Sequence, residues 1–225
     1  MNYLKLNTKL SALAVALVSL SFTSCGNEDN PPSEKAYLTC PDDHHPHLID
    51  LGLPSGTKWA CCNVGASTPE EYGDYIAWGE TSAKSAYNWD TYQYGSSEDD
   101  VVNIGSDIAD TGYDAATVNC GTPWRMPSAA QIAELINNTT SIWTTQNNVS
   151  GRKFTGSNGG TIFLPAAGII WDEFRGMDGS WGYYWGSTLD ESDQSCAYGI
   201  YFGSDDMCWL SRDYRNYGRT VRPVR

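Results

Sequence analysis

One cysteine near the start of the chain lies where a lipoprotein signal peptidase could cleave. Cys25 directly follows Phe22-Thr23-Ser24, and small side chains before a cysteine favour such cleavage. The thiol of the new N-terminal cysteine would then carry a lipid. A positively charged start and an apolar stretch over residues 10–20, too short to span a bilayer, fit a signal peptide. We expect residues 1–24 to be removed and Cys25 to be lipidated; the alternative is an ordinary secretory signal.

Histidines give little support for catalysis or for a metal centre. His44, His45 and His47 all lie at the entry to the predicted domain, so a nucleophile in its body would have to recruit a histidine from this entry segment. No phosphate loop, Gly-x-Ser-x-Gly elbow or His-Glu-x-x-His motif occurs. The histidines could hold a metal, but a solvated linker is the simpler interpretation, because no zinc-type ligand spacing surrounds them. We therefore expect no metal, no cofactor and no enzymatic activity.

The cysteines beyond Cys25 are compatible with an oxidising compartment, where disulfides form. Cys61 and Cys62 are adjacent and rarely bond each other, and the absence of Cys-x-x-Cys spacing gives a zinc site no support. Cys196 and Cys208 bracket two candidate strands and form a possible disulfide. The remaining connectivity stays open.

The charge of the chain excludes two classes of partner. The net charge of −13 becomes −15 once Lys5 and Lys9 leave with the signal peptide. Nucleic acid needs a cationic face, and anionic lipid would repel this domain, so we expect membrane contact through the lipid anchor only. The acidic segment over residues 95–112 and the pair Asp205-Asp206 do not match a dense calcium loop, and we interpret both as solvated.

Aromatic and small polar residues gather late in the chain and are the candidate binding residues. The chain has 9 Trp and 14 Tyr but only 5 Phe, and aromatic rings with a polar edge suit a surface that is both apolar and hydrogen-bonding. Tyr and Trp give rigid contact area, while Ser, Asp and Asn give adaptable hydrogen bonds. We assign Tyr184, Trp185, Tyr198 and Phe202 to the core. The predicted exposed, ligand-binding face contains Tyr183, Asp190, Ser192, Asp205, Asp206, Trp209, Arg212, Asp213, Tyr214, Asn216 and Tyr217.

The elements that must position these residues are mostly short strands separated by Gly, Asn, Asp and Ser turns. We expect strands over residues 47–51, 58–62, 152–155, 161–164, 197–202, 207–210 and 220–224. The clearest helix begins after Pro127, where Ser128 is a good N-cap and Gln131 completes a capping box. Residues 95–112 are predicted to be a long surface loop.

Several runs in order along the chain resemble one known family. They cover residues 50–60, 63–66, 72–80, 114–119, 124–128, 163–168, 184–187 and 218–224. Together they resemble the Fibrobacter succinogenes major paralogous domain family, which is abundant in Bacteroidetes lipoproteins. The resemblance implies an α+β, C-type lectin-like domain with short helices, a twisted antiparallel sheet and long surface loops. The acidic residues 26–30 are similar to the export tag of surface lipoproteins in that phylum, or they are simply a polar tether.

These observations predict a signal peptide over residues 1–24, a lipidated acidic and Pro-rich tether over 25–46, and a binding domain over 47–225. We expect a lipoprotein of the outer membrane, exposed on the cell surface, that binds an extracellular protein or carbohydrate. The late Tyr, Ser, Asp and Asn residues resemble positions that retroelements diversify in lectin-like domains. Two alternatives stay open: a structural or fimbrial envelope component, and a formylglycine-type oxidoreductase with copper bound by Cys196 and Cys208.

Overall fold

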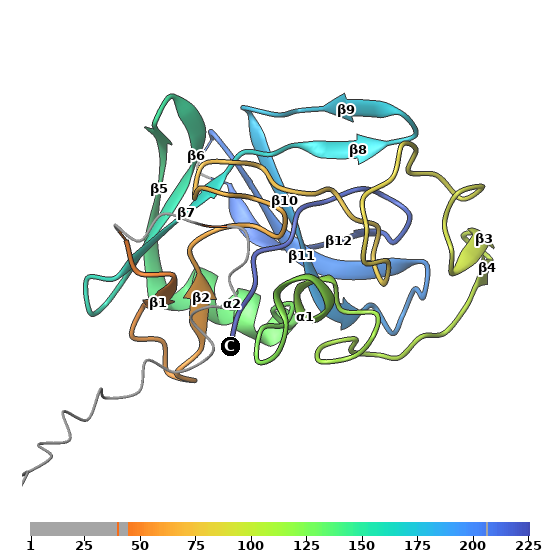
Figure 1. Ribbon diagram of the computed structural model, residues 1–225, viewed down its shortest axis with the longest axis horizontal. Coiled ribbons are helices and arrows are strands. Elements are labelled where there is room, and N and C mark those ends of the chain that lie inside the picture. The colour runs from red at the N-terminus through yellow and green to blue at the C-terminus, as the bar shows by residue number, and fades with distance from the viewer. Residues whose placement is uncertain (1–39, 41–44, 206) are drawn as a thin grey trace, which may run out of the picture. The chain divides into compact units, whose positions relative to one another are not determined.

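The computed structural model describes residues 40, 45–205 and 207–225 (Figure 1). The predicted signal peptide, the lipidation site Cys25 and the candidate ligand residue Asp206 lie outside this part of the chain. Small antiparallel sheets dominate it, with two short helices, which confirms the expected α+β class. Neither helix has the length and apolar character needed to cross a membrane.

Two three-stranded antiparallel sheets form the framework, each in simple chain order. One contains β5 (Thr139–Gln146), β6 (Val149–Gly156) and β7 (Thr161–Pro165). The other contains β10 (Trp181–Leu189), β11 (Cys196–Gly203) and β12 (Cys208–Tyr214). Three two-stranded ribbons complete the β structure: β1 (Leu48–Asp50) with β2 (Lys58–Ala60), β3 (Gly95–Ser97) with β4 (Asp100–Val101), and β8 (Ile169–Trp171) with β9 (Phe174–Gly176).

Turn chemistry explains the sheet that contains β5, β6 and β7. Asn147 and Asn148 both have positive φ, 47° and 65°, as a two-residue hairpin turn between right-twisted strands requires. The β6–β7 hairpin is confirmed where the sequence predicts it, on either side of a Gly-rich turn. The long loop predicted over residues 95–112 contains the short β3–β4 ribbon but is otherwise irregular, apart from an isolated bridge at Asp107.

Both helices begin at a side-chain cap. α2 (Ala129–Asn138) has the predicted capping box, in which Ser128 and Gln131 satisfy each other's backbone N–H groups. Its buried face packs on the sheet that contains β10, β11 and β12. α1 (Ala115–Cys120) is capped by the buried carboxylate of Asp114, which accepts hydrogen bonds from the backbone N–H groups of Ala116 and Thr117. Burial raises the pKa of Asp114, and hydrogen bonds from the backbone N–H groups of Thr117 and Met126 oppose the rise.

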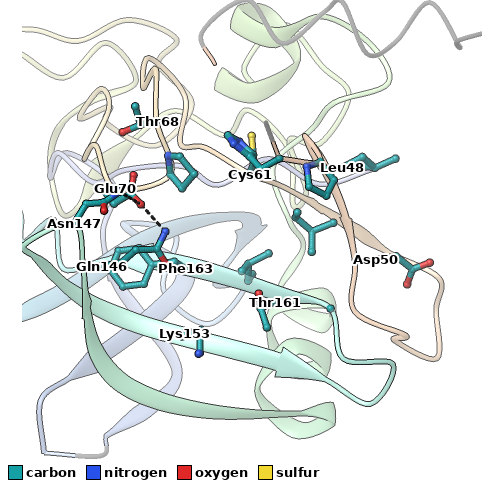
Figure 2. Close-up of a pocket in the computed structure, with 16 residues that line it drawn as sticks. Leu48, Asp50, Cys61, Thr68, Glu70, Gln146, Asn147, Lys153, Thr161 and Phe163 are labelled. Carbon is teal, nitrogen blue, oxygen red and sulfur yellow. Dashed lines mark hydrogen bonds between the residues drawn. The ribbon is translucent and has the colours of Figure 1, made fainter. Parts of the chain in front are cut away.

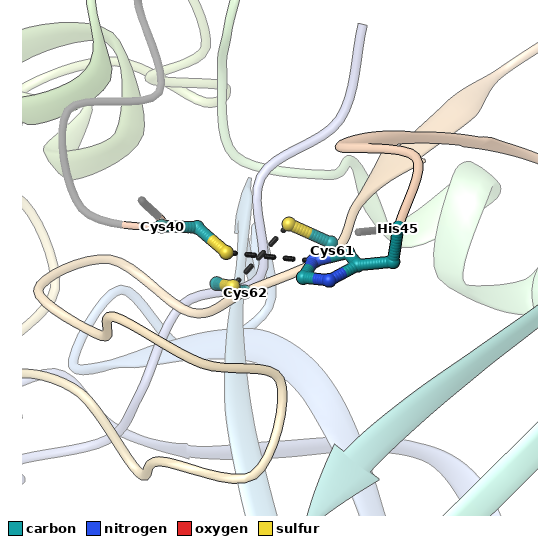
Figure 3. A group of neighbouring side chains, drawn as sticks. All are labelled: Cys40, His45, Cys61 and Cys62. Carbon is teal, nitrogen blue, oxygen red and sulfur yellow. Dashed lines mark hydrogen bonds between the residues drawn. The ribbon is translucent and has the colours of Figure 1, made fainter. Parts of the chain in front are cut away.

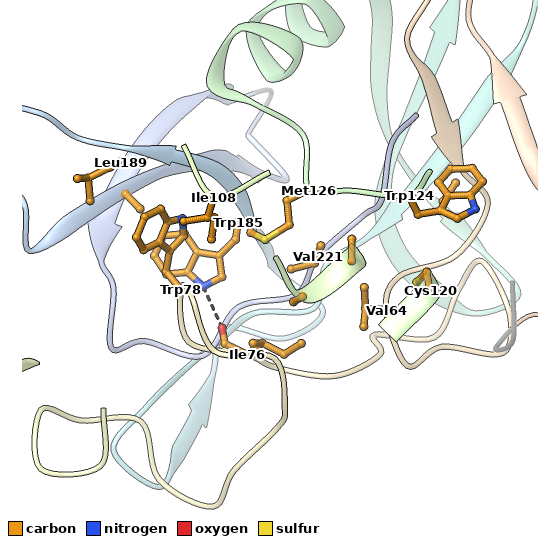
Figure 4. Packing of buried hydrophobic residues seen from close by; sticks show 14 residues of the cluster. Val64, Ile76, Trp78, Ile108, Cys120, Trp124, Met126, Trp185, Leu189 and Val221 are labelled. Carbon is orange, nitrogen blue, oxygen red and sulfur yellow. Dashed lines mark hydrogen bonds between the residues drawn. The ribbon is translucent and has the colours of Figure 1, made fainter. Parts of the chain in front are cut away.

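The core is built around large aromatic rings. Figure 4 shows one of its clusters, in which the indole nitrogen of Trp185 donates to the carbonyl of Ile76 at 2.9 Å. Trp78 lies fully buried in the same cluster, and its indole nitrogen donates to the carbonyl of Gly186 at 3.0 Å. Tyr184, Trp185 and Phe202 are buried as predicted, whereas Tyr198 is only half-buried and does not belong to the core.

The C-terminal segment crosses the core without forming a regular strand. The strand predicted over residues 220–224 is replaced by isolated bridges, two of them at Val224. Three fully buried arginines, Arg215, Arg219 and Arg222, follow one another along this segment. Arg222 donates to the carbonyl of Ala60 at 3.1 Å and to that of Phe163 at 3.0 Å, so one cation joins segments that are far apart in the chain. The backbone groups of this segment bond to several separate segments, around Lys58, Val64 and Arg125, and not to one continuous strand as the sequence pattern predicts.

Candidate functional site

Four aromatic side chains lie together on one face of the sheet that contains β10, β11 and β12, and one of them, Tyr201, contacts the other three. The group, here called the aromatic row, consists of Trp181, Tyr183, Tyr201 and Trp209. Tyr183 lies opposite Tyr201 in the β10–β11 ladder, and Tyr201 lies opposite Trp209 in the β11–β12 ladder. Neighbouring ring centroids are 4.9 to 5.0 Å apart, and Trp209 is 43% exposed. Trp209 is therefore the most exposed ring, and the half-buried rings of Trp181, Tyr183 and Tyr201 add to the surface beside it.

The alternation of side chains along a strand places Tyr201 on the opposite face from Ile200 and Phe202. The face that carries the aromatic row is buried further along β10, where the core residue Trp185 lies two residues after Tyr183. Ile200 and Phe202, on either side of Tyr201, are both buried. The sequence predicts Tyr183 and Trp209 as ligand-binding residues but misses Trp181 and Tyr201. The same alternation would have identified them, because Trp181 and Tyr183 are two residues apart on one strand.

A buried cation lies beside one ring of the aromatic row. The Arg219 guanidinium lies 5.2 Å from the Tyr183 ring centroid and 4.4 Å from the Trp185 ring centroid. Arg219 is fully buried and forms an ion pair with Asp213 on β12. Burial lowers the pKa of Arg219, and the Asp213 carboxylate opposes that effect. Asp213, which the sequence assigns to ligand binding, is placed to hold Arg219 against the rings.

Asp190 is not exposed as the sequence predicts, because hydrogen bonds hold it in the turn between β10 and β11. It is 3% exposed and accepts from the backbone N–H of Ser192 at 3.0 Å, from the Ser192 hydroxyl at 2.7 Å and from Arg212. Burial raises the pKa of Asp190, but the bonds from Ser192 and Arg212 outweigh it, so the pKa is lower than usual. Ser192 and Arg212 are exposed as predicted. The three residues thus stabilise a turn.

The remaining predicted residues do not join the aromatic row. Tyr214 and Tyr217, with ring centroids 5.7 Å apart, line a separate hollow of about 210 Å³. They lie at the end of β12, whereas Trp209 lies near its start, roughly 17 Å away by the rise of a strand. Asn216 is 3% exposed, so its predicted exposure is wrong, and Asp205 is exposed in the turn between β11 and β12. The predicted binding face is therefore at least two separate surfaces.

The possible disulfide between Cys196 and Cys208 is not present. Cys208 lies opposite Phe202 in the β11–β12 ladder, at the far end of β11 from Cys196. Six residues of strand separate the two positions by roughly 20 Å, well beyond the reach of a disulfide. Burial raises the pKa of each thiol to about 11. The two cysteines cannot bind one copper ion together either.

A second feature, a pocket lined in part by β1 and β7, was not expected from the sequence. This pocket of about 490 Å³ is lined by apolar side chains that include Leu48 and Phe163, and by a buried carboxylate, Glu70 (Figure 2). Glu70 accepts hydrogen bonds from Gln146, drawn as a dashed line, and from Asn147. Both amides come from the β5–β6 hairpin, so Glu70 fixes that hairpin beside the pocket.

Cysteine and histidine side chains cluster at the edge of this pocket. Cys40, His45, Cys61 and Cys62 bring their Sγ and ring nitrogen atoms within 4.8 Å of one another (Figure 3). The hydrogen bond from Cys62, opposed by burial and aided by His47, lowers the pKa of Cys61 to about 4, and the same bond raises the pKa of Cys62. The sequence places Cys40 and His45 in a solvated tether, but Cys40 is 3% exposed and packs with Cys61 and Cys62.

No family model, no curated protein and no solved structure matches the chain.

Proposed function

We propose that the protein is a surface-displayed lipoprotein whose domain binds an extracellular ligand through the aromatic row. The observation that carries this proposal is the group of four contiguous rings on one sheet face, of which Trp209 is exposed and the other three are half-buried, with a buried cation against Tyr183. Exposed, rigid aromatic side chains in contact with one another are typical of binding surfaces, where they bury large areas at a low entropic cost.

A neutral carbohydrate is the ligand that best fits this surface. The apolar C–H faces of sugar rings stack on aromatic rings, and the polar edges of Tyr and Trp can bond the hydroxyl groups. Side chains on the face of a sheet do not enclose a ligand, so the aromatic row suits a chain of sugars that lies along the sheet better than a small molecule that needs an enclosed pocket. The strongly acidic chain would repel anionic polysaccharides, which favours an uncharged ligand. An extracellular protein is the alternative ligand.

The finer fold assignment is part of the same proposal. A C-type lectin-like domain is supported by the two short helices, the small antiparallel sheets and the long irregular segments between β2 and α1. Anchoring is supported by the cysteine at position 25 after an apolar leader. Cys25→Ala should release the protein from the membrane fraction, and protease added to intact cells should digest the wild-type domain.

Binding is best tested with the full-length chain in detergent on a glycan array, followed by affinity measurement for each positive glycan. Trp209→Ala should weaken binding at least tenfold, as expected for a hot-spot ring that costs about 2 kcal/mol when truncated. The matched control is Ile142→Ala, since Ile142 is 54% exposed on β5 of the other sheet. Equal affinities for the two variants would contradict the proposal, and binding to a protein array alone would support the alternative ligand.

A further inference from the structure

The thiol and imidazole groups beside the β1–β2 ribbon come from two separate parts of the chain. Cys40 and His45 belong to the segment that leads into β1, whereas Cys61 and Cys62 follow directly after β2. All three thiols are buried, and His45 is half-buried. In Figure 3 the four side chains point toward a common centre. Such convergence of four ligand groups is the arrangement of a closed metal site.

Local backbone geometry explains how adjacent cysteines can both face one point. Successive side chains of a strand point to opposite faces, so Cys61 and Cys62 could not share a site within β2. β2 ends at Ala60, and the chain bends at the two cysteines. Their Sγ atoms lie 3.3 Å apart, too far for a disulfide bond of about 2.05 Å.

The distances within the cluster suit a tetrahedral ion. Zinc holds sulfur at about 2.3 Å and nitrogen at about 2.0 Å, which places ligand atoms roughly 3.5–3.8 Å apart. The Cys40 Sγ to His45 Nε2 distance is 3.4 Å, and no pair of the four ligand atoms is more than 4.8 Å apart. Small side-chain movements would therefore complete a tetrahedron. Three sulfur ligands and one imidazole favour zinc over calcium or magnesium, which prefer oxygen.

Neighbouring groups support a charged metal centre. His47 Nδ1 lies 3.4 Å from Cys61 Sγ, and such contacts orient ligands and tune their basicity. Three thiolates around Zn²⁺ leave one net negative charge. The fully buried Arg222 donates to the backbone carbonyl of Cys61 and supplies a compensating positive charge.

We propose that Cys40, His45, Cys61 and Cys62 bind one zinc ion that fixes the segment before β1 onto the folded domain. Four protein ligands close the coordination shell, so the ion is structural and leaves no open position for a substrate. This site would join the lipidated tether to the domain at a defined point, independently of the ligand that the aromatic row binds.

The test is the metal content of the full-length chain, purified without oxygen in detergent and supplied with stoichiometric zinc. Wild type should retain one zinc per chain, and X-ray absorption should show three sulfur neighbours and one nitrogen. Cobalt substitution should give the intense visible bands of a tetrahedral thiolate site. Cys62→Ser should lower zinc affinity at least tenfold, as should His45→Ala. Cys120→Ala, which removes an equally buried thiol of α1 outside the cluster, should retain the metal.

Two results would overturn the proposal. The first is that wild-type protein binds no zinc and shows no tetrahedral cobalt spectrum. This result does not depend on whether any variant folds. The other is a disulfide between Cys40 and either Cys61 or Cys62, identified by mass spectrometry of the non-reduced protein from cells. Loss of glycan binding would leave the zinc content unaffected. Failure of the zinc proposal can therefore be distinguished from failure of the binding proposal.

Discussion

Removing the carboxylate of Asp213 should destabilise the protein by leaving the buried Arg219 cation without its ion-pair partner. Breaking a fully buried pair in this way costs about 3–5 kcal/mol. The Asp213 side chain is 28% exposed, so water already screens part of the interaction, and the rings of Tyr183 and Trp185 continue to stabilise the cation. We therefore expect Asp213→Asn to lower the free energy of unfolding by about 2 kcal/mol, or Tm by roughly 4–8 °C.

Urea denaturation of the full-length chain, monitored by circular dichroism, would measure this loss. The control is Asp178→Asn, whose partner Arg175 is as exposed as Asp178 itself, so the change should cost less than about 0.5 kcal/mol. The double variant Asp213→Asn/Arg219→Met should lose less than the sum of the single variants, because it removes the unpaired charge. Equal stability of Asp213→Asn and Asp178→Asn would refute the claim that Asp213 holds a buried cation.

Two further predictions concern the supports of the sheet that contains β10, β11 and β12. Asp190→Asn should lower stability by about 2 kcal/mol at neutral pH. Because the folded-state pKa of Asp190 is depressed, its contribution is present above its unfolded pKa and lost as pH falls through the folded one. The difference in free energy of unfolding between Asp190→Asn and wild type, measured by urea denaturation, should therefore disappear below about pH 4. A difference that does not change with pH would contradict the role given to the Asp190 carboxylate. Gly199→Ala should destabilise the protein more than Gly112→Ala in the same urea assay. A Cβ at Gly199 would lie 2.1 Å from the carbonyl oxygen of Tyr184, whereas a Cβ at Gly112 would have no neighbour within 4 Å. Equal stability of the two variants would contradict the close approach of the backbone at Gly199.

Local signals in the sequence predict the hairpins and the cap of α2 because they act within a few residues. The Ser128 and Gln131 capping box needs only three residues to form, and it appears in the structure as expected. The alternation of β11 likewise places Phe202 inside. β5 was missed, although its β-branched threonines and its Trp and Ile residues are typical of a strand.

Features that depend on distant contacts could not be predicted. Asp190 and Asn216 read as exposed polar residues, but hydrogen bonds within a turn bury the first, and packing at the end of β12 buries the second. The strand expected over residues 220–224 is replaced by isolated bridges, because its backbone pairs with several segments that are far apart in the chain. The cluster around Cys61 has no motif spacing, because its ligands converge only after β1 and β2 pair.

The central claim is that the aromatic row contacts the ligand. The most direct measurement is a titration of the full-length chain with the best glycan, followed by NMR of the indole N–H groups. The indole N–H signals of the exposed Trp209 and the half-buried Trp181, which both contact Tyr201, should shift together with one dissociation constant, while those of the buried Trp78 and Trp185 stay fixed. Binding that leaves Trp181 and Trp209 unmoved would contradict the account.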